Sequence, residues 1–226
     1  MSKTFIISLG GSILVPDSID VVYVRAFVKF IKKYTAKNCR FFIIVGGGRT
    51  ARAYQQAAAA AGVVQDEDKD WLGIHATRLN AHLLRTVLRS IAHPRILTEP
   101  KVREKITRPV CIGAGWRPGR STDFMAVSLA KLYGVTTIIN LSNIDYAYTA
   151  DPKKYAQATP LKAMTWKELQ KLTGQKWTPG MHTPFDPIAT KKAQKMHLKL
   201  ILVNGKKLKN LGCIFEGKSF MGTVVE

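Results

Sequence analysis

The chain has 226 residues, 46% of them hydrophobic. This length suits one α/β domain with a substantial core and is short for two domains that each have their own core. Lys and Arg number 35 against 15 Asp and Glu, and this net charge of +20 favours anionic partners such as nucleotides, nucleic acid or an acidic surface. No apolar stretch reaches the roughly 18 residues that a membrane helix needs, which argues against a membrane-spanning protein.

Apolar runs alternate with helical patterns along the chain, and this alternation predicts an α/β fold with a largely parallel central sheet. Most of the expected strands are continuous apolar runs, as strands covered on both faces should be. They are Thr4–Leu9, Phe41–Val45, Pro109–Gly113, Thr136–Leu141 and Leu198–Val203, with a weaker one at Arg95–Thr98. The first run lacks the cleavage pattern of a signal peptide, so we expect it to be a buried strand of a cytoplasmic protein.

Helices are expected between these strands. The first spans the apolar positions from Val21 to Ile31, with Asp17 and Ser18 as possible caps. The others are Thr50–Ala61, Leu72–Ile91, Asp123–Tyr133, a short helix opened by the capping box of Thr165 and Glu168, and one from Asp186 to about His197. The wide apolar stripe of the predicted helix Leu72–Ile91 could face the core or another subunit. The Gly-, Pro- and Thr-rich segment 173–184 is predicted to be a loop.

Three glycine-rich segments each follow an apolar strand and precede a helical pattern. They are Gly10-Gly11-Ser12, Gly46-Gly47-Gly48 and the stretch from Gly113 to Gly119. Ligands of open α/β sheets bind beyond the carboxyl ends of the strands. Glycine lets backbone N–H groups approach phosphate oxygens there, and the following helix adds partial positive charge. The three segments together predict an anionic ligand, although the P-loop pattern G-x-x-x-x-G-K-[ST] is absent.

Cations and hydroxyls accompany these glycines. Arg52 falls in the first turn of the predicted helix 50–61, where its guanidinium could reach the same phosphate, or it could be a solvated surface cation. Arg117 and Arg120 precede Ser121 and Thr122 at another helix start, which suits a phosphate clamp, although capping alone would explain either hydroxyl. The segment 142–152 offers amide, phenol and carboxylate groups, which turn formation explains equally well.

No motif indicates a metal held by the protein alone. The three cysteines, Cys39, Cys111 and Cys213, form no C-x-x-C pair, and the five histidines show no H-E-x-x-H spacing. We therefore expect free thiols and no zinc site.

Several motifs taken together resemble the amino-acid-kinase superfamily, and within it the archaeal-type UMP kinases. They are S-L-G-G-S at Ser8–Ser12, G-G-G-R-T-A-R-A-Y at Gly46–Tyr54, D-W-L-G-I-H-A-T-R-L-N-A at Asp70–Ala81, P-G-R-S-T-D at Pro118–Asp123, Y-T-A-D-P at Tyr148–Pro152 and F-D-P-I-A at Phe185–Ala189. The resemblance runs from the first strand to Gly222-Thr223. It implies a three-layer sandwich in a single domain, 1–226, with an acceptor-binding part at roughly 1–135 and an ATP-binding part at roughly 136–226.

The resemblance also implies an activity, the transfer of the γ-phosphoryl group of Mg-ATP to UMP in pyrimidine biosynthesis. It implies catalytic roles for Gly10, Arg52 and Asp123. The ATP-binding residues would be Ser8, Leu9, Gly10, Gly11, Ser12, Gly48, Arg52, Ser142, Asn143, Tyr148 and Asp151. The UMP-binding residues would be Gly47, Asp70 (at the ribose), Trp116, Arg117, Pro118, Gly119, Arg120, Ser121 and Thr122. Mg²⁺ would arrive with ATP, and the resemblance suggests a homohexamer built from dimers.

The chain departs from the family pattern at three places. Ser8 stands at the lysine of the K-x-G-G motif, Tyr146 stands at the glycine of D-G-V-Y, and no lysine occurs in the segment 180–185 where some relatives have one. Three other readings stay open: another phosphate or carboxylate acceptor, a non-catalytic nucleotide or anion binder, and an RNA-associated protein. The basic residues are scattered without a recognisable RNA-binding motif, so we expect nucleic acid to bind only nonspecifically.

Overall fold

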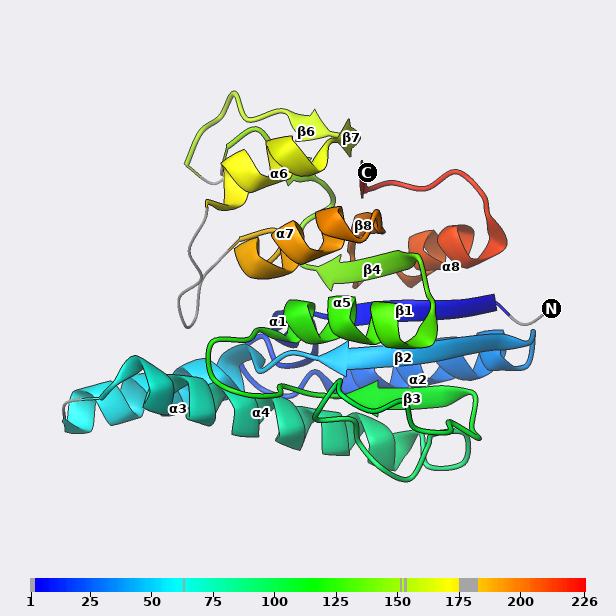
Figure 1. Cartoon of the computed structure of the whole chain (residues 1–226), viewed down its shortest axis with the longest axis horizontal. Coiled ribbons are helices and arrows are strands. Elements are labelled where there is room, and N and C mark those ends of the chain that lie inside the picture. The colour runs from blue at the N-terminus through cyan, green and yellow to red at the C-terminus, as the bar shows by residue number, and fades with distance from the viewer. Residues whose placement is uncertain (1–2, 63, 151, 153, 175–182) are drawn as a thin grey trace.

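The computed structural model describes residues 3–62, 64–150, 152, 154–174 and 183–226. A seven-stranded sheet lies between two layers of helices (Figure 1). In order across the sheet the strands are β3 (Val110–Gly113), β2 (Cys39–Val45), β1 (Lys3–Leu9), β4 (Thr137–Ser142), β8 (Lys199–Asn204), β9 (Thr223–Val225) and β7 (Ala163–Met164). The first five are parallel to one another, and β9 pairs antiparallel with β8. This arrangement confirms the predicted three-layer fold with a largely parallel sheet.

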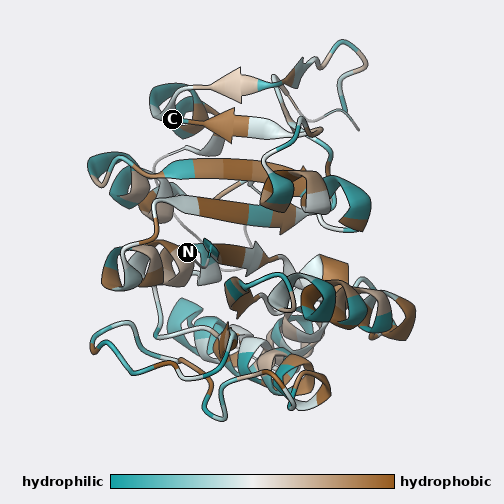
Figure 2. Ribbon diagram, turned by 90° about the vertical axis from the view of Figure 1, so that its right-hand side faces the viewer, coloured by the Kyte–Doolittle hydropathy of each residue, from teal (hydrophilic) through white to brown (hydrophobic). Residues whose placement is uncertain are grey.

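Each face of the sheet is covered by its own hydrophobic cluster. On one face the strands pack against α1 (Gly11–Leu14), α2 (Val21–Thr35), α4 (Asp66–Val87) and α8 (Leu208–Glu216). On the other face they pack against α5 (Thr122–Tyr133), α6 (Trp166–Thr173) and α7 (Pro187–Lys195). Figure 2 shows the hydrophobic strands between helices that carry hydrophilic residues. Burial on both faces explains why these strands are continuous apolar runs in the sequence.

The remaining elements lie at the edges of this sandwich. Helix α3 (Gly48–Ala61) packs along α4 (Figure 1), and a two-stranded ladder joins β5 (Ala147–Tyr148) to β6 (Pro160–Leu161). None of the helices in the part of the chain that the structure describes is long and apolar enough to cross a membrane.

Helix caps follow the sequence closely, with one exception. Ser121 caps α5, the Thr165–Glu168 capping box opens α6, and Asp186 caps α7, all as predicted. The prediction for α2 was wrong, because the carboxylate of Asp20 accepts the N–H of Tyr23 at 2.9 Å, and neither Asp17 nor Ser18 caps this helix. The cap must directly precede the first helical residue to reach its N–H groups.

Two other predictions were wrong, the bounds of one helix and the existence of one strand. Helix α4 begins at Asp66 and ends at Val87, whereas Leu72 and Ile91 were predicted. The segment 95–98 forms no strand, since within it only Leu97 makes an isolated bridge, to Gly113. Prolines 94 and 100 flank this segment, and proline lacks the N–H that would extend the ladder.

Candidate active site

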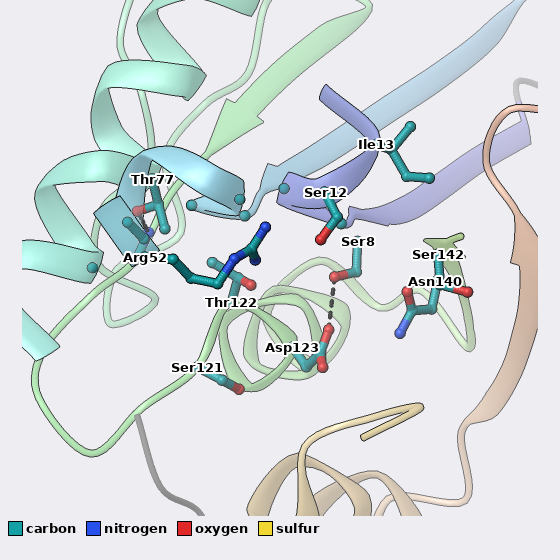
Figure 3. A pocket seen from close by; sticks show the side chains of 18 of the residues that line it. Ser8, Ser12, Ile13, Arg52, Thr77, Ser121, Thr122, Asp123, Asn140 and Ser142 are labelled. Atoms are coloured by element: carbon teal, nitrogen blue, oxygen red, sulfur yellow. Dashed lines mark hydrogen bonds between the residues drawn. The ribbon is translucent and has the colours of Figure 1, made fainter. Parts of the chain in front are cut away.

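A pocket of about 340 Å³ lies at the carboxyl ends of β1, β2 and β4, where α1, α3 and α5 begin (Figure 3). Most of the predicted site residues line it, although they come from distant parts of the chain. They are Ser8, Gly10, Gly11, Ser12, Gly47, Gly48, Arg52, Asp70, Arg120, Ser121, Thr122, Asp123, Ser142 and Asn143. The parallel topology explains this convergence, because carboxyl ends of parallel strands meet at one edge of a sheet.

The first two glycine loops touch each other backbone to backbone. A Cβ atom on Gly11 would lie 2.6 Å from the carbonyl carbon of Gly46 and 2.7 Å from that of Gly47, which leaves no room for a side chain. Gly48 has φ +61°, a left-handed conformation that favours glycine. Glycine is therefore required here by the packing of the two loops, whether or not a ligand is bound.

A buried asparagine of α4 orients the second glycine loop. The Nδ2 group of Asn80 donates to the carbonyl oxygens of Gly46 (2.9 Å) and Gly47 (3.0 Å). These contacts turn two loop carbonyls toward α4. The N–H groups of Gly11, Ser12 and Gly48 belong to the first turns of α1 and α3, and first-turn N–H groups have no partner within their helix. The site thus presents backbone donors for an anion.

Arg52 projects from the first turn of α3 into the pocket, between Ser12 and Thr122 (Figure 3). Within the described part of the chain its guanidinium forms no ion pair. Arg49, three residues earlier on the same helix, is exposed and lies outside the lining. The geometry thus places Arg52, and not Arg49, where it can meet a bound phosphate.

Ser8 and Asp123 form a hydrogen-bonded pair on the floor of the pocket. The Ser8 hydroxyl donates to Asp123 Oδ1 at 2.7 Å, and the backbone N–H of Asp186 donates to Oδ2 at 3.1 Å. Burial, reinforced by the nearby Asp186 carboxylate, raises the pKa of Asp123 to about 7 although these two bonds oppose the rise. A cation arriving in the pocket would favour the ionised carboxylate.

Helix α4 fixes the loop that precedes α5. The Asp70 carboxylate accepts the N–H of Gly119 at 2.7 Å, and the Thr77 hydroxyl accepts the N–H of Gly115 at 2.8 Å. Arg78 donates to the carbonyls of Gly115 and Trp116 at 3.4 and 3.2 Å. Burial raises the pKa of Asp70, and the Gly119 hydrogen bond opposes that rise. Only one Asp70 oxygen is used in this contact, so the other remains for a hydroxyl of a ligand.

The structure divides the predicted UMP-binding segment 116–122, called the acceptor loop below, into two halves. Arg120, Ser121 and Thr122 line the pocket, whereas the segment 116–119 lies outside the lining. Within that outer segment the Arg117 guanidinium stacks over the Trp116 ring at 4.2 Å from its centroid. Of the two arginines predicted to bind the UMP phosphate, only Arg120 therefore lines this pocket.

Among the described residues, two predicted ATP-binding residues are not in the pocket lining. Leu9 is buried in β1 and contributes its carbonyl, which accepts the N–H of Gly46 at 2.9 Å. Tyr148 lies in β5 outside the pocket lining, and Asp151 lies outside the described residues. The buried Asn140, which was not among the predicted residues, also lines the pocket, and its Nδ2 donates to the carbonyl of Pro184 at 3.1 Å.

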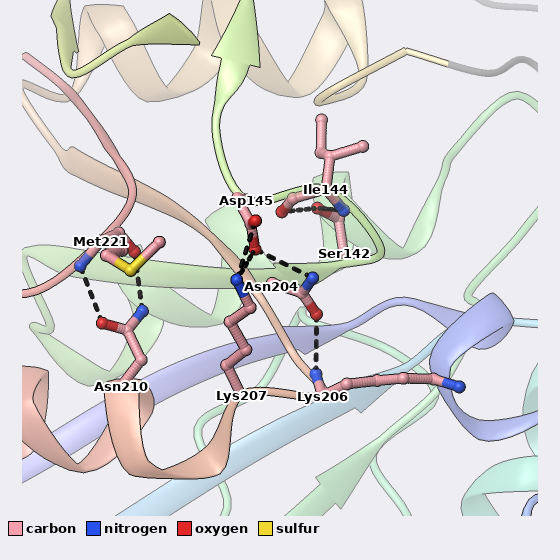
Figure 4. A network of polar contacts seen from close by, with 8 residues as sticks. All are labelled: Ser142, Ile144, Asp145, Asn204, Lys206, Lys207, Asn210 and Met221. Atoms are coloured by element: carbon pink, nitrogen blue, oxygen red, sulfur yellow. Dashed lines mark hydrogen bonds and ion pairs between the residues drawn. The ribbon is translucent and has the colours of Figure 1, made fainter. Parts of the chain in front are cut away.

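A polar network holds the loop after β4 (Figure 4). The Asp145 carboxylate accepts from Lys207 Nζ at 2.8 Å and from Asn204 Nδ2 at 3.1 Å, and these contacts lower its pKa. Asn204 ends β8 and Lys207 precedes α8, so the loop is tied to the opposite end of the polypeptide.

Among the residues that the structure describes, no group of three or more His, Cys, Asp or Glu side chains could form a metal site. The pocket lining contains two carboxylates, Asp70 and Asp123, on separate helices. A divalent cation at Asp123 would therefore need further oxygen ligands from a bound molecule.

Comparison with known proteins gives consistent matches over nearly the whole length. Residues 3–204 match the model of the amino acid kinase family. The uridylate kinase of Methanospirillum hungatei is 36% identical over 98% of this chain and 94% of its own, and that of Thermoplasma volcanium is 33% identical over 100% and 99%. The crystal structure of uridylate kinase from Archaeoglobus fulgidus superposes with a TM-score of 0.82 at 28% identity, covering 99% of this chain and 100% of that chain.

Proposed function

Because this chain belongs to the amino acid kinase family, and within it to the archaeal-type uridylate kinases, we propose that it transfers the γ-phosphoryl group of ATP to UMP, giving UDP and ADP. One observation in the structure supports this activity independently of family membership. A single pocket brings together two glycine loops, Arg52 and the N-terminus of α5, and these can hold the phosphates of two nucleotides side by side.

The chemistry in this pocket is mainly positioning and charge neutralisation. Phosphoryl transfer spreads negative charge over the γ-oxygens and needs donors and cations, not a covalent nucleophile. The backbone N–H groups of Gly11, Ser12 and Gly48 bind the ATP phosphates, and Arg52 offsets the charge that develops between the two substrates. The UMP phosphate is largely ionised at neutral pH and attacks directly, without a general base.

The acceptor side is formed by the start of α5 and by α4. Arg120, Ser121 and Thr122 bind the UMP phosphate, and the free oxygen of Asp70 accepts a hydrogen bond from the ribose. Gly47 lies between the two substrates. The donor side takes Ser142 and Asn143 from the end of β4, so the first part of the chain (1–135) holds UMP and the second part (136–226) completes the ATP site.

The residues fit a Mg²⁺ ion that arrives with ATP. Mg²⁺ binds through one or two carboxylates together with substrate phosphates, and Asp123 supplies one carboxylate in the lining. The ion would neutralise phosphate charge when bound. Asp123 then acts in its ionised form, with Ser8 holding its orientation through the 2.7 Å hydrogen bond.

We also propose a cytoplasmic homo-oligomer, a hexamer built from dimers. The support is a set of exposed apolar side chains on the adjoining helices α3 and α4, which include Tyr54, Trp71, Leu79 and Val87. The three cysteines are free, as is usual in a reducing compartment. Light scattering coupled to size exclusion would measure the mass, and a monomer of about 25 kDa at micromolar concentration would refute this assembly.

A coupled ADP-release assay tests the activity. The panel contains UMP, CMP, dUMP, acetylglutamate and isopentenyl phosphate, each with Mg-ATP, and we expect the highest kcat/KM with UMP. Release of ADP with another acceptor alone would keep the fold and change the substrate. No release with any acceptor from folded protein would favour the non-catalytic binder, a reading motivated by Ser8 in place of lysine.

A further inference from the structure

A second pocket, of about 440 Å³, lies outside the active site, between the outer half of the acceptor loop and the helices α5 and α7. Its lining is rich in cationic and aromatic side chains. It consists of Pro100, Trp116, Arg117, Arg120, Phe124, Ser128, Lys131, Leu132 and Lys192. Arg120 lines both this pocket and the active-site pocket. The proposed phosphoryl transfer uses none of the other residues on α5 and α7 that line this second pocket.

Four cations converge here without a carboxylate bound to them. Arg117, Arg120, Lys131 and Lys192 form no ion pair with any residue in the described part of the chain. Two carboxylates lie close to the arginines, and both have other partners. Glu99 pairs with Lys101 at 2.6 Å, and Asp186 caps α7. The cluster therefore retains an excess of positive charge.

The cations are held in place by aromatic faces. Lys192 Nζ lies 4.1 Å from the centroid of the Phe124 ring and donates to the Ser128 hydroxyl at 2.6 Å, while the Arg120 guanidinium lies 4.8 Å from the same ring. Arg117 stacks on Trp116. Such contacts reduce the freedom of long side chains before any ligand binds, and less entropy is then lost on binding.

The crowding has a measurable consequence at Lys192. Burial lowers the pKa of this half-buried ammonium, and the neighbouring charges of Lys131 and Arg120 lower it further. One of the three Lys192 N–H groups is used by Ser128, so others remain for an acceptor in the pocket. The Nε atom of Arg120 is buried and has no partner among the described residues. An anion would relieve the repulsion among these groups.

We propose that this pocket binds a small anion with two or three linked phosphate groups, as in inorganic triphosphate or a nucleoside triphosphate. Four convergent cations exceed what a single carboxylate needs. The pocket has the volume of a small-molecule site, and its cations surround a hollow instead of following a stripe along the surface, which distinguishes it from a nucleic-acid track. Because Arg120 lines both pockets, an occupant here shares its guanidinium with UMP, so each ligand weakens the binding of the other without excluding it.

Calorimetric titration of the full-length protein with inorganic triphosphate tests the site directly. UMP and the non-hydrolysable analogue AMP-PNP are kept saturating with constant free Mg²⁺, so that the active site is occupied. The Lys131→Gln/Lys192→Gln variant removes two cations that line only the second pocket. The matched control is Lys29→Gln/Lys32→Gln on α2, which removes the same charge from an exposed surface elsewhere.

We expect one triphosphate per chain in the natural protein and in the control, and at least about tenfold weaker binding in the pocket variant. The single change Lys131→Gln, at an exposed position, should weaken binding in the same direction if the double variant unfolds. No binding to the natural protein, or equal weakening in the control, would overturn the proposal.

Two further arms identify the occupant and its effect. Titration with dTTP shows whether a nucleoside is accepted with the triphosphate; binding of only the inorganic compound assigns the site to free polyphosphate. Tight binding of a single-stranded oligonucleotide without triphosphate binding would overturn the small-anion proposal in favour of nucleic acid. The kinetic measurement rests on the proposed UMP kinase activity. We expect triphosphate to raise the KM for UMP in the natural protein but not in the pocket variant. An unchanged KM would overturn the coupling through Arg120, whereas calorimetry tests the site independently of activity.

Discussion

The active-site pocket has two sides that are built in different ways. The start of the acceptor loop is fixed by side chains of one long helix, because Asp70, Thr77 and Arg78 of α4 bind the backbone of residues 115, 116 and 119. The donor loop, residues 142–148, is tied through Asp145 to Lys207 and Asn204. Partly exposed ion pairs contribute little, so the Asp145 contacts hold the donor loop less firmly than the α4 contacts hold the acceptor loop.

Ser8 and Asp123 lie between these two sides. A hydroxyl at position 8 supplies a hydrogen bond to the carboxylate but no positive charge, unlike the lysine of the K-x-G-G pattern. In the proposed mechanism, the charge that balances the transferred phosphate then comes from Arg52, Arg120 and a cation brought by ATP. For this reason we expect the largest losses of kcat from changes to residues that lie between the acceptor side and the donor side.

The largest expected effect is that of Arg52→Ala. In the proposed mechanism the guanidinium serves both substrates, so we expect kcat to fall by at least tenfold, and by roughly 10²-fold if it binds the transition state more tightly than the ground state. Steady-state ADP release measures this. Arg49→Ala on the same helix is the matched control and should keep nearly full activity. A kcat for Arg52→Ala equal to the control's would remove Arg52 from the mechanism.

Gly11→Ala should break the contact between the two glycine loops. The new methyl group would lie within 2.7 Å of the carbonyl carbons of Gly46 and Gly47, and overpacking of this kind costs about 1–3 kcal/mol. We expect the melting temperature to fall by several degrees and the transfer of phosphate from ATP to UMP to be lost. Gly62→Ala is the control, since nothing lies within 4 Å of a Cβ there. Equal melting temperatures for the two variants would show that the loops can separate freely.

Asp123→Asn should change how stability depends on pH. The folded-state pKa of about 7 lies above the ordinary value of 3.8, so the unbound protein loses stability as pH rises from about 4 through 7. Between pH 5 and pH 8 this loss is on the order of 1–3 kcal/mol, and the Asn variant should lack it. Urea unfolding of both proteins at the two pH values gives the difference. Parallel pH profiles would mean that Asp123 is ionised throughout this range.

The sequence predicted the parts of the fold that depend on local patterns. The five parallel strands were found because burial on both faces leaves continuous apolar runs, and α6 and α7 because their caps are encoded by neighbouring residues. Strands β7 and β9 were missed, since two or three residues carry no periodicity. Helix α8 was also missed, because no side chain caps its start after Lys207.

The candidate site was predictable where glycine, arginine and helix starts coincide along the chain. The supporting residues were not, because Asn80, Thr77 and Asn140 act through contacts with segments distant in sequence. A polar residue in the middle of a helix is usually solvated, and only the tertiary structure shows that Asn80 is buried against a loop. The same limit applies to the second pocket, where α5 and α7 bring Lys131 and Lys192 together.

The comparison between the two sides is tested most directly by the KM values of a pair of charge-neutralising variants. Asp70→Asn should raise the KM for UMP about fivefold to tenfold, the scale of one charge-assisted hydrogen bond, and change the KM for ATP by less than about twofold. Asp145→Asn, which weakens the exposed tie of the donor loop, should raise the KM for ATP by about twofold to threefold and leave that for UMP unchanged. Equal changes in both KM values, in either variant, would contradict a pocket with separately supported acceptor and donor sides.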